Sequence, residues 1–233
     1  MAVTFFTGKG APIHDPEEVA QFLASEGHWR PGHPLYEVVH SWIAAKGIPP
    51  SVQAVLATDP VLAGANALKV YFEKKTGVHE SGQASLTDVV ALVGAADRDA
   101  IVGIEAKVDE PFGPVVIDWN NTAGRDDRIE GLLRILGIRK ENAWHLRYQL
   151  LHRAAAIVIE AASFRTRDAV LIIQSFSASS ARYGFRDFQE FTSVMDAPLI
   201  EPGRLTEPVI VHGISVRFGW AEDRPKEAIS IPM

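Results

Sequence analysis

The stretch SLTDVVALVGAADRDAIVGIEAKVDEPFG, residues 85–113, decides the fold. Residues 86–93 and 100–108 are rich in Val, Ile, Leu and Ala, which favours β-structure. Between them, Gly94 and the polar run Asp97, Arg98 and Asp99 provide turn chemistry. The pattern therefore predicts two strands joined as a hairpin.

The second of these strands carries a carboxylate and an ammonium on one face. Side chains alternate along a strand, so Glu105 and Lys107 point to the same side, roughly 6.6 Å apart at about 3.3 Å of rise per residue. The apolar residues of this strand fall on the other side: Val102, Ile104, Ala106 and Val108.

Asp88 stands on the first strand of the hairpin. Regular alternation predicts that it shares a face with the apolar residues Leu86, Val90 and Leu92. An ionised carboxylate on such a face is costly unless a cation or hydrogen-bond donors compensate it. A metal ion would meet that cost.

Asp88, Glu105 and Lys107 together suit phosphodiester hydrolysis. Two carboxylates can hold Mg²⁺, with Mn²⁺ as a substitute, and the metal polarises a phosphate and acidifies an attacking water. Lys107 can orient that water or neutralise developing charge. The alternative is a solvated sheet face with an i, i+2 ion pair of small energetic value.

This D...ExK arrangement, formed by Asp88, Glu105, Ala106 and Lys107, resembles the PD-(D/E)xK, or restriction-endonuclease-like, nuclease superfamily. Thr87 stands where the motif's proline would be. The segments SLTD, EAKVDEPFGP and LRYQLLHRAAAIVIEA, followed by a strand ending in QSFS, are together similar to one bacterial family of such proteins, over roughly residues 30–220.

The resemblance implies an α/β fold with a restriction-endonuclease-like core, in which helices flank a mixed central sheet and extra helices precede it. It implies metal binding by Asp88 and Glu105, assistance by Lys107 and support from Gln149. Glu73, on a predicted strand over 69–76, would add a third metal-binding carboxylate; alternatively it is an exposed acid beside Lys74 and Lys75.

Other polar residues are further candidates. Glu37 is either an additional acid on a leading helix or a solvated surface glutamate, and Glu110 is a candidate neighbour of the site. Gln149, His152 and Arg153 share one helical face at i, i+3 and i+4, where they could contact a phosphate backbone or the water shell of a metal. Alternatively, His152 is a satisfied, partly buried histidine and Arg153 pairs with surface acids.

We expect one domain over residues 1–233, made of a helical region (1–68), a nuclease-like core (69–176) and a C-terminal helix with strands (177–233). Helices are predicted over 15–25, 35–46, 51–69, 142–162 and 185–194, with a short one inside 118–140. Further strands are predicted over 169–176 and, as a pair around Gly213, over 208–220.

Composition is that of a globular protein, with 233 residues, 47% hydrophobic and 22% charged. The net charge of −6 argues against broad coating of nucleic acid, although a local basic groove is compatible with it. The absence of cysteine excludes disulfides and thiolate zinc sites. Neither a signal peptide nor a transmembrane run is recognisable, so a cytoplasmic protein without a membrane partner is expected.

The function expected from these observations is that of a Mg²⁺-dependent nuclease acting on nucleic acid, DNA rather than RNA. Two alternatives stay open: a catalytically inactive, nuclease-like interaction protein, and a small-molecule phosphohydrolase using the same site. The oligomeric state is also open, with a homodimer as one form.

Overall fold

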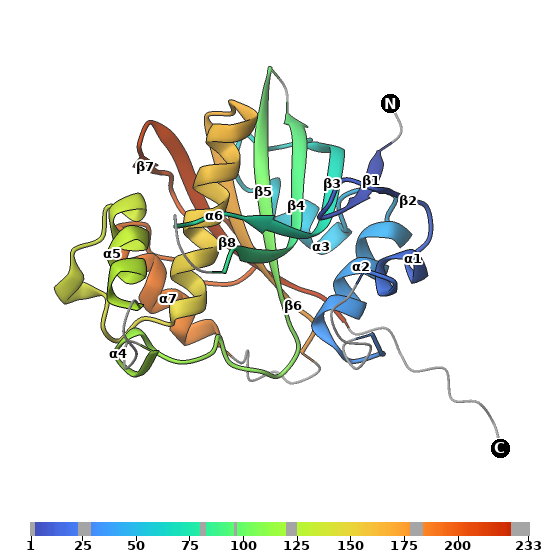
Figure 1. Cartoon of the computed structure of the whole chain (residues 1–233). Coiled ribbons are helices and arrows are strands. Elements are labelled where there is room, and N and C mark those ends of the chain that lie inside the picture. Colours follow the sequence, from blue (N-terminus) through green and yellow to red (C-terminus); the bar gives the residue numbers. More distant parts are fainter. Residues whose placement is uncertain are drawn as a thin grey trace.

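The computed structural model describes residues 3–22, 29–79, 83–95, 97–119, 125–177 and 184–224. Within these residues, one mixed sheet of eight strands has the order β2-β1-β3-β4-β5-β6-β8-β7. Figure 1 shows α5, α6 and α7 on one side of this sheet and α1 and α2 on the other. The fold class is therefore α/β, with helices flanking a mixed sheet, as the sequence predicts.

The strands combine an antiparallel meander with parallel crossovers. Neighbours β3, β4 and β5 are antiparallel, whereas β5, β6 and β8 run parallel, and β1 is parallel to β3. The strands are β1 (Thr4–Thr7), β2 (Pro12–Ile13), β3 (Asn66–Thr76), β4 (Ser85–Ala95), β5 (Arg98–Lys107), β6 (Asp168–Ser175), β7 (Val209–Val211) and β8 (Ile214–Glu222).

Helices follow the predicted segments with shifted ends. They are α1 (Glu17–Ala20), α2 (Pro34–Ala44), α3 (Pro50–Leu56), α4 (Val116–Trp119), α5 (Arg125–Leu136), α6 (Tyr148–Phe164) and α7 (Phe185–Val194), with a 3₁₀ turn at Lys140–Asn142. The hairpin β4–β5, the buried strand β6, helix α7 and the final strand pair are confirmed. Part of the helix predicted over 15–25 lies outside the described residues.

Three expectations are wrong. The helix predicted over 51–69 ends at Leu56, because Pro60 cannot donate a helical hydrogen bond and Gly64 has φ +76°, and β3 already begins at Asn66. The predicted start of a helix at Asn142 is a 3₁₀ turn, and α6 begins at Tyr148. The region 1–68 is not purely helical, because β1 and β2 extend the sheet beyond β3.

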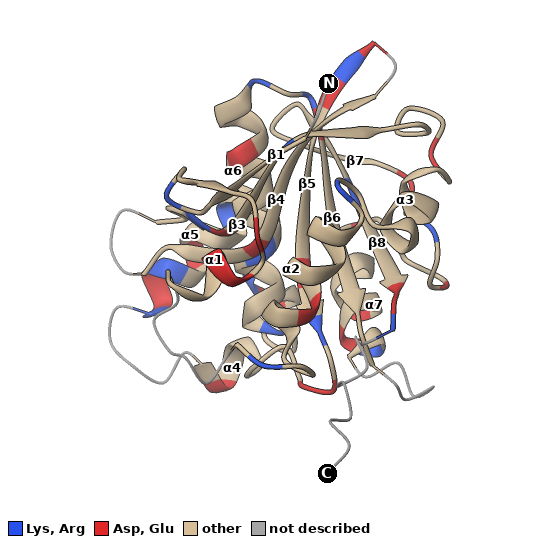
Figure 2. Cartoon of the chain, turned by 90° about the vertical axis from the view of Figure 1, so that its right-hand side faces the viewer, with Lys and Arg blue, Asp and Glu red and all other residues tan. Residues whose placement is uncertain are grey.

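Each face of the sheet has its own hydrophobic core. Helices α5, α6 and α7 cover one core, which includes Ile101, Leu171 and Trp220, and α2 and α3 pack over the other, which includes Val102 and Ile104. Figure 2 shows most of the visible length of β4, β5 and β6 without charged residues behind α2. Since consecutive residues of β5 enter opposite cores, the predicted alternation of this strand is confirmed.

Helix α6 lies unusually close to β5 at Gly103. A Cβ atom on Gly103 would lie 2.3 Å from Cγ2 of Ile157 on α6, so no larger residue fits unless the Ile157 side chain or the helix moves. This close approach sets how near the polar beginning of α6 comes to the end of β5. Among the described residues, no helix is long and apolar enough to cross a membrane.

Gly103→Ala tests this close approach. Because the added methyl group overlaps Ile157, we expect the free energy of unfolding to fall by about 1–3 kcal/mol, measured by urea denaturation. Gly77→Ala is the control, since a Cβ there has no neighbour within 4 Å and its backbone does not require glycine. Equal stabilities of the two variants would contradict the argument.

Candidate active site

Strands β4 and β5 separate at the position of Glu105. Their pairing ends with Val89 opposite Ile104, whereas β5 continues to pair with β6 through Glu105 and Lys107. The carboxyl end of β5 is thus held on one side only. Polar side chains occupy the place where the ladder between β4 and β5 would otherwise continue.

Asp88 closes the gap between these strands. Its Oδ2 accepts a hydrogen bond of 2.7 Å from the backbone N–H of Ala106, so a side-chain carboxylate replaces a backbone carbonyl as the acceptor. This bond fixes the carboxylate beside the ExK segment. The expectation that Asp88 lies near Glu105 is supported by the electrostatic effect of Glu105 on its pKa.

The regular alternation of β4 is interrupted around Asp88. Ser85 contacts His152 of α6, and Val90 belongs to the core under α6, so both face this helix. In a regular strand they would face opposite sides, because an odd number of residues separates them. Val89 belongs to the opposite core. The predicted shared face is therefore wrong for Leu86, which lies with Phe72 on the opposite face because the strand turns over within this segment, whereas Val90 and Leu92 do share the face under α6.

Strand β3 has a matching irregularity at Glu73, which lies opposite Asp88. The pairing of β3 with β4 passes from Phe72 and Val89 to Lys74 and Thr87 without joining the residues between them. Glu73 has φ +56°, a backbone conformation that is uncommon for residues other than glycine. The two strands thus distort together at the two acids.

Glu105 is compensated from three directions. Its Oε2 accepts from Nε of Arg153, and its Oε1 lies 2.5 Å from Nε2 of Gln149 and 3.1 Å from Nζ of Lys107. Nζ of Lys107 also donates to Oε1 of Gln149 at 3.1 Å. Because Glu105 and Lys107 are only 2% and 4% exposed, their charges depend on these contacts.

Arg153 has a role in the site that the sequence does not predict, the compensation of Glu105. It was expected to face a phosphate or a surface acid, but it is buried and bound to Glu105 and to Oγ of Ser85, the latter at 3.0 Å. Its spacing of i+4 from Gln149 was the available indication. Gln149 contacts both Glu105 and Lys107, as its predicted supporting role requires.

The carboxyl groups differ in their electrostatics. Burial, followed by the charge of Glu105, raises the pKa of Asp88 well above its ordinary value. Burial also disfavours the charge of Glu105, but Arg153 and Lys107 outweigh it and hold its pKa below the ordinary value. Burial raises the pKa of Glu73 to about 7, although Arg153 opposes the shift.

His152 is a neutral hydrogen-bonding group. Its Nδ1 lies 2.9 Å from Oγ of Ser85, and burial, together with the charge of Arg153, lowers its pKa to about 2. A ring with such a pKa is not in the imidazolium form at neutral pH, so it does not serve as a general acid. The alternative of a satisfied, partly buried histidine describes it well.

Two other acids lie in different places. Glu110 approaches Lys107 at 3.8 Å and accepts from the backbone N–H of Val108, so it does neighbour the site. Glu37 lies on α2 and accepts from the N–H of Gly32. It is only 2% exposed, so a solvated surface position is wrong, and α2 packs on the sheet face opposite α6.

The donor set fits a hard divalent cation held by few protein ligands. No group of three or more His, Asp or Glu side chains suited to a metal occurs in the part of the chain that the structure describes, so Glu73 is not gathered into a three-acid cluster. Mg²⁺, however, keeps several waters and needs only one or two carboxylates. A cation would relieve the like-charge crowding of Asp88, whereas Glu105 would exchange one present hydrogen bond for it.

A family model described as a domain of unknown function (DUF6946) matches residues 12–225. No curated protein and no solved structure matches the chain.

Arg153→Met tests the compensation of Glu105. Removing one partner of a buried ion pair leaves the other charge uncompensated, so we expect the free energy of unfolding to fall by about 3–5 kcal/mol in EDTA. Adding Glu105→Leu should restore part of the loss. Arg186→Met, which breaks an exposed pair with Glu190, is the control and should change little. Additive losses in the double variant would exclude the coupling.

Asp88→Asn tests the raised pKa of Asp88. Since the folded state holds this proton more tightly, the resulting stability is complete below the ordinary pKa of 3.8 and is lost as pH rises towards the folded pKa. The variant escapes this loss. In EDTA it should therefore gain stability over the wild type above about pH 4 but not at about pH 3. Urea denaturation across this range checks the prediction, which a pH-independent difference would refute.

Proposed function

This chain belongs to the DUF6946 family, a family of unknown function, and we propose that it is a Mg²⁺-dependent phosphodiesterase, a nuclease of the restriction-endonuclease-like kind. The observation that carries the proposal is the convergence of Glu105, Lys107 and Gln149 at the end of β5, beside Asp88 on the separating strand β4. The fold supports it through the order β4, β5, α6, β6, with α4 and α5 inserted before α6; strand, strand, helix, strand is the order of the core that the resemblance implies.

Asp88 and Glu105 would hold the metal, with Mn²⁺ as a substitute for Mg²⁺. The bound ion would polarise the phosphate and lower the pKa of a coordinated water. Asp88 suits this role because its environment disfavours its charge while Ala106 fixes its position. Glu105 suits it because Arg153 and Lys107 keep it ionised.

Lys107 would act on the phosphate or the attacking water. Its ammonium is placed by Glu105 and by Oε1 of Gln149, so it is oriented before substrate arrives. A preorganised cation stabilises negative charge that develops in the transition state. Gln149 joins the carboxylate and the ammonium and thereby acts as a positioning residue.

A catalytically inactive, nuclease-like interaction protein is the second candidate. It is favoured by the saturation of Glu105, both of whose oxygens have hydrogen-bond donors from the protein itself. In that case the acids are a structural ion-pair cluster. Metal binding distinguishes the two functions.

Calorimetric titration with Mg²⁺ and Mn²⁺ is the first test. We expect the wild type to bind, and Asp88→Asn and Glu105→Gln to lose binding, because each removes one ligand charge. Lys107→Met should retain metal binding but cleave DNA about 10²–10³-fold more slowly, since it removes one electrostatic stabiliser. Cleavage is measured on circular and linear DNA and on RNA.

Asp109→Asn is the matched control for these variants. Asp109 lies two residues after Lys107, but it is exposed and accepts from Ser177, so its loss should change neither binding nor cleavage. Absence of binding by the folded wild type at millimolar metal would exclude the metal-dependent activity and favour the interaction protein.

A further inference from the structure

A cavity of about 360 Å³ lies beside the distorted segment of β3 and β4. Its walls come from α1, from the end of β1 and from these two strands. They include four apolar side chains: Val19, Phe22, Phe72 and Leu86. The volume lies at the lower end of the range for small-molecule sites, so the cavity has room for one small ligand but not for a nucleic-acid duplex.

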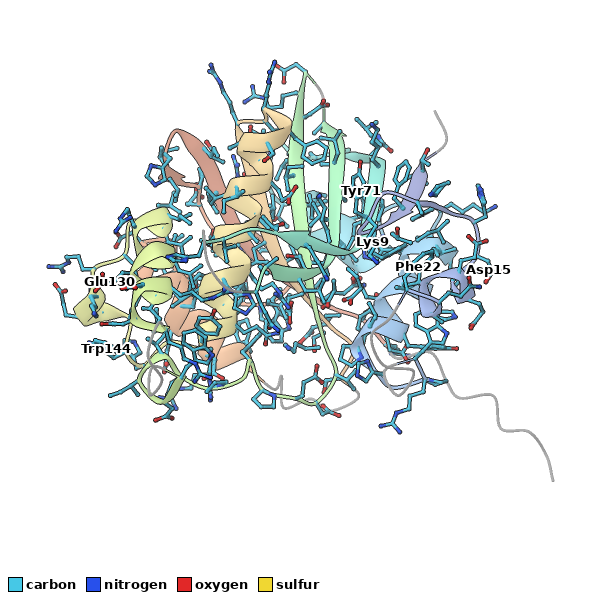
Figure 3. The ribbon with its side chains drawn as sticks, in the orientation of Figure 1. Lys9, Asp15, Phe22, Tyr71, Glu130 and Trp144 are labelled. Carbon is cyan, nitrogen blue, oxygen red and sulfur yellow. The ribbon has the colours of Figure 1, made fainter. Side chains whose placement is uncertain are left out.

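Charged groups line the same cavity. Lys9 and Lys75 are exposed lysines on its lining, and Glu73 is a half-buried acid on it. Figure 3 shows Lys9 and Phe22 beside one another, on the side of β3 where α1 lies. Two ammonium groups at an apolar cavity favour a ligand that carries both an anionic group and an apolar or aromatic body.

The cavity is connected to the candidate active site through Glu73. This residue lines the cavity and lies opposite Asp88 on the neighbouring strand. Its charge is close enough to affect the pKa of Asp88. A ligand seated here would therefore contact Glu73, the neighbour of Asp88, whereas Asp88 itself does not line the cavity.

The wall at Glu73 is rigidly built. A Cβ atom on Gly8 would lie only 1.9 Å from the carbonyl oxygen of Glu73, so the end of β1 is pressed against the left-handed residue of β3. Thr7, next to Gly8, is buried and also lines the cavity. The sheet thus forms this wall of the cavity, while Lys9 and Phe22 line it from the turns after β1 and α1.

We propose that this cavity binds a single nucleotide unit, with its phosphate at Lys9 and Lys75 and its base against Phe22. The proposal rests on the proposed function and specifies its substrate: a nucleotide that is either free or the terminal unit of a strand. Base and aromatic ring stack regardless of base identity, and lysine binds phosphate as a point charge. Glu73 can accept hydrogen bonds from the amino or hydroxyl groups of the nucleotide.

Glu73 also argues against a fatty acid, which would satisfy the lysines and the apolar walls equally well. An alkyl chain offers neither a donor nor an acceptor, so it would cover the carboxyl group of Glu73 without forming a hydrogen bond to it. A nucleotide presents polar edges as well as a flat apolar face. The combination of Phe22, two lysines and an inner acid therefore suits a nucleotide better.

The test is calorimetry of nucleoside 5′-monophosphates in EDTA, beside nucleosides, inorganic phosphate and decanoate. We expect monophosphates to bind best. Lys9→Ala combined with Lys75→Ala should lower the affinity for monophosphates about tenfold, and Phe22→Ala should lower it about fivefold or more. Lys69→Ala is the control, because Lys69 is exposed on the same strand but does not line the cavity.

Specific outcomes would overturn the proposal. Inorganic phosphate binding as tightly as a monophosphate would mean that the cavity recognises an anion only, and tighter binding of decanoate would indicate a lipid site. Unchanged affinities in the lysine and Phe22 variants, compared with Lys69→Ala, would place any binding elsewhere on the protein.

Competition against a fluorescent monophosphate separates the two sources of the nucleotide. A linear 5′-phosphorylated oligonucleotide that competes, when a closed circle of the same sequence does not, identifies a strand end. If neither the linear nor the circular oligonucleotide competes, the ligand of the cavity is a free nucleotide. Equal competition by the circle would overturn a site for one terminal or free unit.

The metal site and the cavity fail independently in these experiments. Nucleotide binding is measured in EDTA and in the Glu105→Gln variant, so it is expected to occur without a bound metal. If nucleotide binding is retained and no metal binds, the proposed nucleotide cavity stands and the metal-dependent reaction is excluded. Metal binding and cleavage without nucleotide binding would do the reverse.

Discussion

The buried carboxylate of Glu105 is the constraint on which the site depends. An ionised acid that is almost fully removed from water needs cations and donors, and here they come from two elements: Lys107 from β5, and Gln149 and Arg153 from α6. The compensation therefore ties the beginning of α6 to the end of β5. Gly103 allows the approach that makes these contacts reachable.

The second constraint is the incomplete ladder between β4 and β5. A backbone N–H at this position would be unsatisfied if the strands simply diverged, and Asp88 supplies its acceptor. The same bond holds a carboxylate in a place where burial and neighbouring acids disfavour its charge. Asp88 thus both completes the hydrogen bonding of the backbone and has a perturbed pKa. A strongly perturbed pKa of this kind is common at functional sites.

The sequence predicted the central elements because their patterns are local. The alternation of β5, the hairpin β4–β5, the buried strand β6 and helix α7 follow from periods of two and 3.6 residues. The common face of Glu105 and Lys107 follows from the period of two, whereas their contact with Gln149 depends on how α6 packs on β5. The short strands β1 and β2 were missed because they have only four and two residues, and because β1 joins the sheet through β3, a partner distant in sequence.

The site's remaining features depend on tertiary structure. The interruption at Glu73 and Asp88 involves two strands at once, so alternation counted along either one fails there. The pairing of Arg153 with Glu105 required the distance between α6 and β5, and the burial of Glu37 required the packing of α2. The parallel pairing of β1 with β3 has a kinetic consequence. Its residues precede their partners by a long stretch of chain, so loop-closure entropy disfavours this contact until the meander β3–β4–β5 has formed. The wall built by Gly8 against Glu73 is then among the last parts of the sheet to assemble, after the carboxylates beside it are already in place.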